Sequence, residues 1–271
     1  MSYSKGVAVV TGASSGIGVA YAERLAARGY DLVLVARRED RLREVADRIG
    51  KTADRKVEIL IADLAQTSDL ERVEARLSND DIQILVNNAG LGALGPAAKV
   101  SADALDRLIK INVQSLTRLT RAVLPGFLAR NSGIVVNIAS MIAVMPTPSG
   151  AGYSGSKAYV LNFSRSLQME LAKTGVIVQA VLPGPVRTEF FEASGMTAAP
   201  FPDELFMSAD QLADAALAAL DQGELVCLPS LQDLSLWDTY EAARVALSRA
   251  LMQSGQPARR YSAMVDAGGP R

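Results

Sequence analysis

A tyrosine and a lysine four positions apart, Tyr153 and Lys157, are the residues of this sequence best suited to proton transfer. On a helix, side chains at positions i and i+4 lie on one face a turn apart, so the two groups would be neighbours. An ammonium beside a phenol favours the phenolate, and we expect it to lower the tyrosine pKa from about 10 toward neutral pH. Tyr153 is therefore a candidate proton donor or acceptor for a carbonyl or an alcohol.

A glycine-rich run, TGASSGIG at residues 11–18, lies between an apolar segment and a helix-like segment. Its glycines, Gly12, Gly16 and Gly18, would let backbone amides approach a pyrophosphate, and the amino end of a helix favours that negative charge. The spacing differs from the commoner GxGxxG, and turns of this kind also occur without a ligand. Together with Tyr153 and Lys157, the run indicates hydride transfer from a bound dinucleotide.

The residues after the second apolar segment favour one dinucleotide over the other. Folds that bind NAD usually have an acidic residue there for the ribose hydroxyl, whereas this chain has Ala36 followed by Arg37 and Arg38. Two guanidinium groups can bind a 2′-phosphate and no carboxylate repels it, so NADP(H) is favoured over NAD(H). The alternative is that both arginines only begin an exposed helix, since the sequence RREDRLRE is charged throughout.

Composition excludes several classes of function. The chain has 271 residues, a formal net charge of −1 and no basic stripe, so we expect no nucleic-acid partner. It contains no histidine, which removes Ser-His-Asp hydrolysis and the usual zinc sites, and we expect no metal centre. The single cysteine, Cys227, cannot form an internal disulfide and suits a reducing cytosol.

Short apolar runs alternate with longer amphipathic stretches along most of the chain. The runs are apolar throughout rather than alternating, which is typical of parallel strands covered on both faces. We therefore predict an α/β fold with a doubly wound, seven-stranded parallel sheet and helices on both faces, a Rossmann fold. The predicted strands are 6–10, 31–36, 57–61, 82–86, 133–138, 176–182 and 225–228. The predicted helices are 16–28, 38–50, 68–78, 102–130, 153–173, 209–221 and 233–253.

No linker divides the chain, and we predict one dinucleotide-binding and catalytic domain over residues 1–253. Residues 189–207 carry several aromatic side chains and are predicted to form a lid over the substrate, and residues 254–271 are predicted to form a flexible tail.

The chain enters its first strand at once, without a signal-peptide pattern or an apolar run of about 18 residues. We expect a soluble cytoplasmic protein without a membrane partner.

Further motifs follow the glycine-rich run in a fixed order, and with them the chain resembles the short-chain dehydrogenase/reductase superfamily in its shorter, single-domain branch. The resemblance extends from about Lys5 to Thr188. The matching motifs are TGASSGIG, the pair Asp63-Leu64, NNAG at Asn87-Asn88-Ala89-Gly90, the four residues Asn112, Ser140, Tyr153 and Lys157, and PGPVRT at 183–188.

The resemblance implies a catalytic role for each of the four residues. Tyr153 would be the general acid in reduction and the base in oxidation, and Lys157 would lower its pKa and bind the nicotinamide ribose. Ser140 would hold the substrate carbonyl oxygen, and Asn112 would bind a water that links Lys157 to solvent. Alternatively, Asn112 could hydrogen-bond a neighbouring backbone group and Ser140 could be a simple turn residue.

The resemblance also implies the cofactor contacts. Asp63 would accept a hydrogen bond from the adenine, Asn88 would line the adenosine ribose, and Val186 and Thr188 would contact the carboxamide. The full set of expected cofactor-binding residues is Gly12, Ser14, Ser15, Gly16, Ile17, Gly18, Arg37, Arg38, Asp63, Leu64, Asn88, Ala89, Gly90, Tyr153, Lys157, Pro183, Gly184, Val186 and Thr188.

These patterns predict an NADP(H)-dependent oxidoreductase that transfers a hydride between the nicotinamide and a carbonyl or secondary alcohol of apolar character. The lid aromatics could cover such a substrate or only pack the lid onto the body. One alternative is a catalytically silent NADP(H)-binding regulator, and a second is a sugar-nucleotide epimerase, for which the C-terminal part is short. The family resemblance implies a homotetramer or a dimer.

Overall fold

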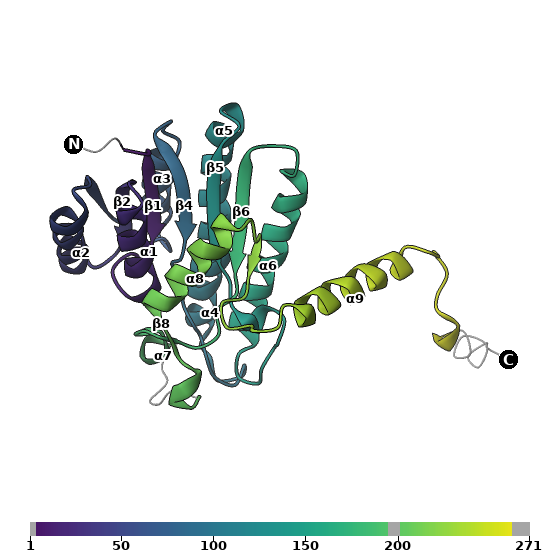
Figure 1. Ribbon diagram of the computed structural model, residues 1–271. Coiled ribbons are helices and arrows are strands. Elements are labelled where there is room, and N and C mark those ends of the chain that lie inside the picture. Colours follow the sequence, from purple (N-terminus) through teal and green to yellow (C-terminus); the bar gives the residue numbers. More distant parts are fainter. Residues whose placement is uncertain (1–3, 195–200, 262–271) are drawn as a thin grey trace. The chain divides into compact units, whose positions relative to one another are not determined.

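Seven parallel strands form the central sheet of the computed structural model, which describes residues 4–194 and 201–261. Figure 1 shows the sheet, whose strand order is β3-β2-β1-β4-β5-β6-β9. The strands are β1 (Val7–Thr11), β2 (Asp31–Ala36), β3 (Val57–Ile61), β4 (Ile82–Asn87), β5 (Gly133–Ile138), β6 (Val176–Val181) and β9 (Val226–Cys227). The predicted doubly wound fold is confirmed, and its order reverses between β1 and β4.

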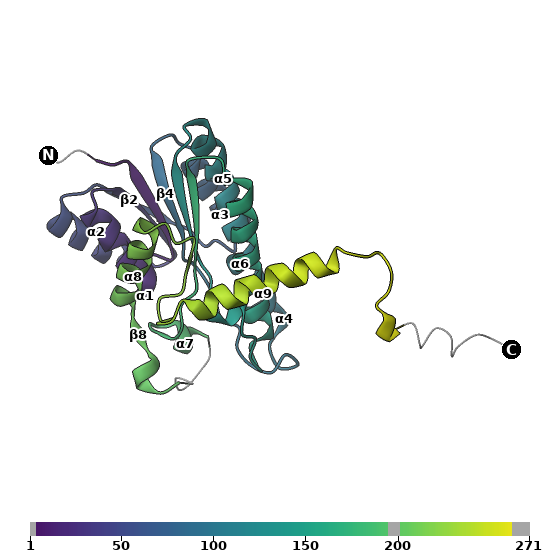
Figure 2. The same ribbon diagram turned by 45° about the vertical axis from the view of Figure 1, so that its right-hand side comes forward.

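Two layers of helices cover the sheet, one on each face (Figure 2). Helices α1 (Gly16–Ala27), α2 (Glu39–Ala53) and α8 (Ala209–Asp221) pack on one face in one apolar core. Helices α3 (Thr67–Leu77), α5 (Leu116–Ala129) and α6 (Ala151–Glu170) pack on the other face in a second core. Because both faces are covered, strands such as β1 and β2 are apolar along nearly their whole length.

The single helix predicted over 102–130 is interrupted. Helix α4 (Ala102–Ile109) passes into a π-helical segment, Lys110–Ser115, before α5 begins. Such segments are rare and are frequently found at functional sites. The segment contains Asn112, which is 1% exposed and forms side-chain hydrogen bonds outside its own helix.

The segment predicted as a lid is built from short elements. Strand β7 (Val186–Arg187) pairs in parallel with β8 (Met207–Ser208), and helix α7 (Phe190–Ala193) and a 3-10 turn (Asp203–Leu205) lie between them. Residues 195–200 of the predicted lid lie outside the described residues. The pairing of β7 with β8 places both ends of the segment together, beside the start of α8.

Contacts divide the chain into two compact units, Met1–Ser230 and Leu231–Arg271. The second unit contains helix α9 (Ser235–Leu251), in which Trp237 stacks on Tyr240 with ring centroids 5.1 Å apart. The single folding domain over 1–253 and the flexible tail over 254–271 stay predictions. Within the described residues, no helix combines the length and apolar character that crossing a membrane requires.

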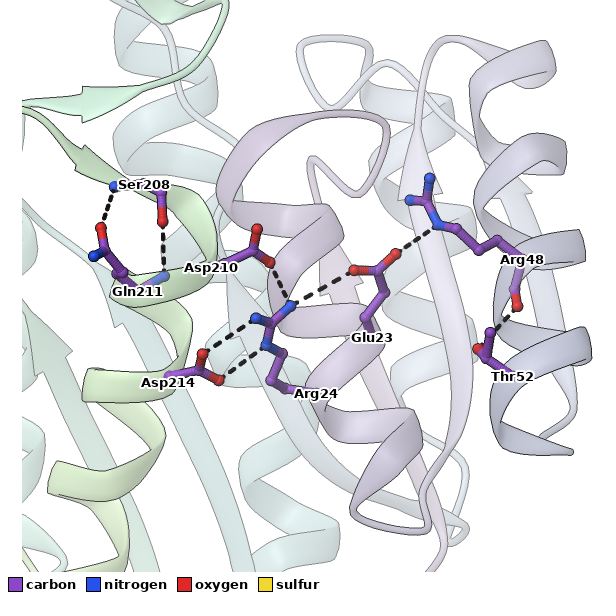
Figure 3. A network of polar contacts seen from close by, with 8 residues as sticks. All are labelled: Glu23, Arg24, Arg48, Thr52, Ser208, Asp210, Gln211 and Asp214. Atoms are coloured by element: carbon purple, nitrogen blue, oxygen red, sulfur yellow. Dashed lines mark hydrogen bonds and ion pairs between the residues drawn. The ribbon is translucent and has the colours of Figure 1, made fainter.

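An arginine of α1 connects this helix to α8 (Figure 3). The Arg24 guanidinium donates hydrogen bonds to Asp214 at 2.9 and 3.1 Å and a further one to Asp210. Asp210 lies in the first turn of α8, where the helix dipole favours a carboxylate. On the other side, Glu23 pairs with Arg48 of α2 at 2.6 Å. This network adds charged contacts to the apolar packing between the three helices of this face.

Replacing Arg24 with methionine should lower the free energy of unfolding by about 1 kcal/mol, because the pair with α8 is lost while the apolar stem is kept. Urea denaturation in about 50 mM and about 500 mM NaCl measures the effect, and the loss should shrink with salt. The control is Arg43→Met, since Arg43 is 66% exposed and pairs only within its helix with Glu39. Equal losses in the two variants would contradict a specific role for the α1–α8 network.

Candidate active site

A cleft of about 780 Å³ lies at the carboxyl ends of the strands, where the strand order reverses. All but two of the residues predicted for the site line this cleft, and the two that do not are Gly18 and Asn112. The predicted residues that line it are Gly12, Ser14, Ser15, Gly16, Ile17, Arg37, Arg38, Asp63, Leu64, Asn88, Ala89, Gly90, Ser140, Tyr153, Lys157, Pro183, Gly184, Val186 and Thr188. The fold therefore assembles motifs that are far apart in the sequence.

Helix α6 presents Tyr153 and Lys157 to the cleft from one face, as the spacing predicts. The Lys157 Nζ lies 5.8 Å from the centroid of the Tyr153 ring and donates a hydrogen bond of 2.7 Å to the backbone carbonyl of Ile138. Lys157 is only 5% exposed, so its ammonium depends on such partners. Because Ile138 is the last residue of β5, this bond attaches the first half of α6 to the end of that strand.

The pKa values of the pair differ from the prediction. Burial lowers the pKa of Lys157 to about 8 and raises that of Tyr153 to about 12, although a hydrogen bond with Ser140 favours the tyrosinate. The predicted lowering of the tyrosine pKa is therefore wrong for the chain by itself, because the cost of burying the phenolate exceeds the effect of the hydrogen bond with Ser140. Tyr153 is a protonated phenol at neutral pH, ready to donate.

Ser140 lies next to Tyr153, just beyond the end of β5. Its Oγ accepts a 3.4 Å contact from the amide of Ile142 and donates one of 3.5 Å to the carbonyl of Pro183. Both distances are long, so these partners hold the hydroxyl weakly. Because the side chains of Ser140 and Tyr153 hydrogen-bond within the cleft, one carbonyl oxygen could accept from both hydroxyls.

Asn112 links the loop after β4 to α6. Its Oδ1 accepts from the amide of Leu91 at 2.8 Å, and its Nδ2 donates to the carbonyl of Leu91 at 2.8 Å and to Ser156 Oγ at 3.0 Å. The side chain thus bonds neighbouring backbone, the alternative considered from the sequence. A Cβ on Gly90 would lie 3.5 Å from Asn112 Oδ1 and 3.6 Å from Lys157 Nζ, so both groups face this turn. Water binding by Asn112 stays a prediction.

The glycine-rich turn is hydrogen-bonded to the loop that follows β4. Gly12 and Gly16 have φ angles of +66° and +52°, which side chains rarely adopt. A Cβ on Gly18 would lie 2.3 Å from the carbonyl oxygen of Gly12. The Thr11 hydroxyl accepts hydrogen bonds of 3.0 Å from the amides of Asn88 and Ala89, which ties the two loops together. The amino end of α1 is therefore open to an anion, and the turn fits a dinucleotide pyrophosphate.

Asp63, which lines the cleft just beyond the end of β3, is paired within the chain. Asp63 accepts a hydrogen bond of 2.8 Å from Arg107 of α4 and one of 3.1 Å from the amide of Ala65. Partial burial disfavours the ionised form, but these two bonds outweigh it and hold the pKa of Asp63 below its usual range. Sequence reasoning missed Arg107, because an arginine on an amphipathic helix carries no signal of a distant partner.

Aromatic side chains form the wall beside Tyr153. The rings of Tyr153 and Phe190 are tilted with centroids 5.3 Å apart, and Phe190 contacts Phe191 at 5.6 Å. The remaining apolar residues that line this end include Leu91, Leu94, Met141, Ile142, Met145 and Phe201. The substrate side of the cleft is therefore apolar around two hydroxyl groups.

Gly92 lies in close contact with α7, which the sequence did not reveal. A Cβ there would lie 2.3 Å from Ser194 Oγ and 3.0 Å from Phe190 Cζ. The absence of a side chain at this position lets α7 and Ser194 lie directly on the loop after β4.

Over residues 4–194 and 201–261, no three histidine, cysteine or acidic side chains are grouped as metal ligands.

Known proteins resemble this chain in sequence. The family model of short chain dehydrogenases matches residues 6–198. A very-long-chain 3-oxoacyl-CoA reductase from Anas platyrhynchos is 40% identical over 192 residues, 69% of this chain and 62% of that protein. An inactive hydroxysteroid dehydrogenase-like protein 1 from Homo sapiens is 39% identical over 194 residues, 70% of this chain and 57% of that protein. The matches thus span less than two thirds of these relatives.

Solved structures match over nearly the whole chain. A short-chain dehydrogenase from Sphingobium yanoikuyae in complex with NADPH is 42% identical, with a TM-score of 0.90 over 94% of this chain and 100% of that one. A bulky-bulky ketone specific alcohol dehydrogenase from Comamonas testosteroni is 37% identical, with a TM-score of 0.87 over 96% and 99%. Together with the site geometry, these matches show that the chain belongs to the short-chain dehydrogenase/reductase family of oxidoreductases.

Proposed function

We propose that this protein is an NADP(H)-dependent reductase of bulky, apolar ketones. The observation that carries the proposal is the pair of hydroxyls of Ser140 and Tyr153 in an apolar part of the cleft that continues into the glycine-rich turn. The phenol of Tyr153, with a pKa of about 12, is suited to donating a proton, which favours reduction over oxidation near neutral pH.

The residues of the chain divide the work of the reaction. The cofactor, when bound, supplies the hydride that adds to the carbonyl carbon. Ser140 Oγ and Tyr153 Oη donate hydrogen bonds to the carbonyl oxygen, and Tyr153 transfers its proton to that oxygen as negative charge develops. Lys157, with a pKa of about 8, can return a proton to the tyrosinate. The apolar wall around Phe190 excludes water and orients the substrate.

NADP(H) is favoured by the basic residues at the end of β2. Arg37 and Arg38 line the cleft beside the glycine-rich turn, where an acidic residue would be needed to select a free ribose hydroxyl. The Sphingobium yanoikuyae relative was solved with NADPH, and the Comamonas testosteroni relative is described as specific for bulky-bulky ketones. Both support the proposed cofactor and substrate class.

A second candidate function is a catalytically silent NADP(H)-binding regulator, since one relative is named an inactive dehydrogenase-like protein. The presence of Ser140, Tyr153 and Lys157 around one cleft argues against it, because binding alone does not require the three groups. Oxidation of NADPH in the presence of bulky aryl ketones and 3-oxoacyl thioesters tests both candidates. No turnover with any carbonyl would favour the regulator. The cytoplasmic location and the homo-oligomeric state stay predictions.

Tyr153→Phe should reduce kcat by about a hundredfold or more and change the NADPH dissociation constant by less than about twofold, because only the proton donor is removed. Steady-state kinetics and fluorescence titration measure the two quantities. The control is Tyr159→Phe on the same helix, whose hydroxyl lies 2.8 Å from Thr117 Oγ1 and outside the cleft. Unchanged turnover in Tyr153→Phe would reject the assignment of the proton donor.

Arg37→Asp should weaken NADPH binding by about tenfold or more and leave NADH binding nearly unchanged, because a carboxylate repels the 2′-phosphate. Titration of both nucleotides measures the ratio of dissociation constants. Arg41→Asp is the control, since Arg41 is an exposed residue of α2 that pairs with Glu44 and does not line the cleft. Equal affinities of the unmodified protein for NADPH and NADH would overturn the proposed preference.

The pKa of Lys157 predicts a stability that rises with pH. Between about pH 8 and 10.5, the unfolded chain keeps a proton on Lys157 that the folded protein has released, so unfolding becomes less favourable. Tyr153 acts oppositely, but only above about pH 10, where the unfolded chain begins to ionise. The buried thiol of Cys227, whose pKa is raised to about 12, also acts oppositely from about pH 9, so the lysine contribution is read as the difference from a variant that lacks Lys157.

Relative to Lys157→Met, the unmodified protein should gain about 2 kcal/mol of unfolding free energy between about pH 7 and 9.5, since one pKa unit corresponds to about 1.4 kcal/mol. Urea denaturation at the two pH values measures this difference. The exposed Lys173→Met is the control and should follow the unmodified protein. A Lys157→Met variant with the same pH dependence as the unmodified protein would show that the buried ammonium is not destabilising.

A further inference from the structure

A salt bridge extends between two sides of the cleft, at the end that adjoins the glycine-rich turn. Arg38 Nη1 donates to a carboxylate oxygen of Glu189 at 2.8 Å, while Nε and Nη2 donate to the hydroxyl and carbonyl of Ser14 at 3.3 Å each. Arg38 follows β2, Ser14 belongs to the turn after β1, and Glu189 directly precedes α7. All three line the same cleft. The bridge therefore joins the cofactor side to the segment that carries the aromatic wall.

The Glu189 carboxylate occupies a donor group that a phosphate would also use. Carboxylates and phosphates are the preferred partners of a guanidinium, and both accept its N–H groups in the same planar geometry. Ser14 accepts hydrogen bonds from Arg38 Nε and Nη2, and Glu189 accepts one from Arg38 Nη1. The side chains of Arg38 and Glu189 are 43% and 53% exposed, so a ligand can reach both and the bridge is weak enough to exchange.

We propose that Glu189 is an internal competitor for the 2′-phosphate of NADP(H), with which it exchanges on Arg38. This inference rests on the proposed use of NADP(H). In the chain by itself, Glu189 neutralises Arg38 and holds the start of α7 against the cofactor side. The 2′-phosphate takes the place of the carboxylate on Arg38, and Glu189 is released. NADH has no 2′-phosphate and cannot make this exchange.

The exchange has a consequence for the substrate side. The carbonyl of Glu189 accepts the α7 hydrogen bond from the amide of Ala193 at 2.9 Å, and the next residue, Phe190, contacts the Tyr153 ring. Release of the Glu189 side chain therefore removes one contact at the start of the segment that forms the wall beside Tyr153, while the backbone bonds of α7 remain.

The same contact would also serve an opposite role for Glu189. A carboxylate beside Arg38 could hold the guanidinium in place while the phosphate binds, in which case removing the carboxylate would weaken NADPH binding. The two roles differ in the sign of one measured quantity, the change in NADPH affinity relative to NADH affinity.

The test is Glu189→Gln, with the dissociation constants of NADPH and NADH measured by fluorescence titration. NADPH affinity should increase by about two- to fivefold relative to NADH affinity, the range expected for loss of an exposed ion pair. Comparing the two nucleotides separates the 2′-phosphate from the pyrophosphate, whose repulsion by Glu189 is the same for both. In an Arg38→Ala background, Glu189→Gln should no longer change this ratio, because the shared partner is absent.

Glu192→Gln is the matched control, an exposed acid three residues further along that does not line the cleft, and it should leave the ratio unchanged. An unchanged or decreased preference for NADPH in Glu189→Gln would overturn the exchange. If Glu189→Gln gives that result but Arg38→Ala weakens NADPH binding, only the exchange is rejected and the proposed cofactor preference stands. If neither Arg37→Asp nor Arg38→Ala alters NADPH binding, the proposed cofactor preference itself fails, and the exchange fails with it.

Discussion

The hydrogen bond from the buried Lys157 ammonium to the carbonyl of Ile138 is the contact on which the geometry of the site depends. A buried ammonium is costly unless it has polar partners, so this bond constrains the first turns of α6 to lie at the end of β5. The same placement brings Tyr153 beside Ser140, which follows that strand. Tyr153 and Ser140, the two hydroxyl groups of the proposed reaction, are therefore positioned by the buried Lys157.

Parallel strand topology explains why so many short motifs reach one place. Each strand of the sheet ends at the same edge, so the loops that follow β1, β2, β4, β5 and β6 all open on one cleft. Bonds between loops then set their separation. Thr11 holds the NNAG loop, and Asn112 holds its continuation at Leu91. The glycines of the turn keep that space free of side chains.

Two charged residues of the cleft are already paired within the chain. Asp63 accepts a hydrogen bond from Arg107, and Arg38 donates one to Glu189. Exposed pairs of this kind contribute little to stability, which makes them easy to rearrange. The substrate end, by contrast, is apolar around two hydroxyls, and there the burial that favours a protonated Tyr153 also favours an apolar ketone.

The sequence by itself predicted the seven strands of the central sheet, because apolar periodicity is a local property of the chain. The motifs shared with the family supplied most of the predicted residues that line the cleft. The tertiary structure decided the pKa values and ion pairs that depend on residues distant in the sequence. The pKa of Tyr153 is set by burial, opposed by a hydrogen bond with Ser140, and this balance cannot be read from the spacing of Tyr153 and Lys157. Likewise, the pairing of Arg38 with Glu189 joins residues 151 positions apart, and only the folded chain brings them within hydrogen-bonding distance.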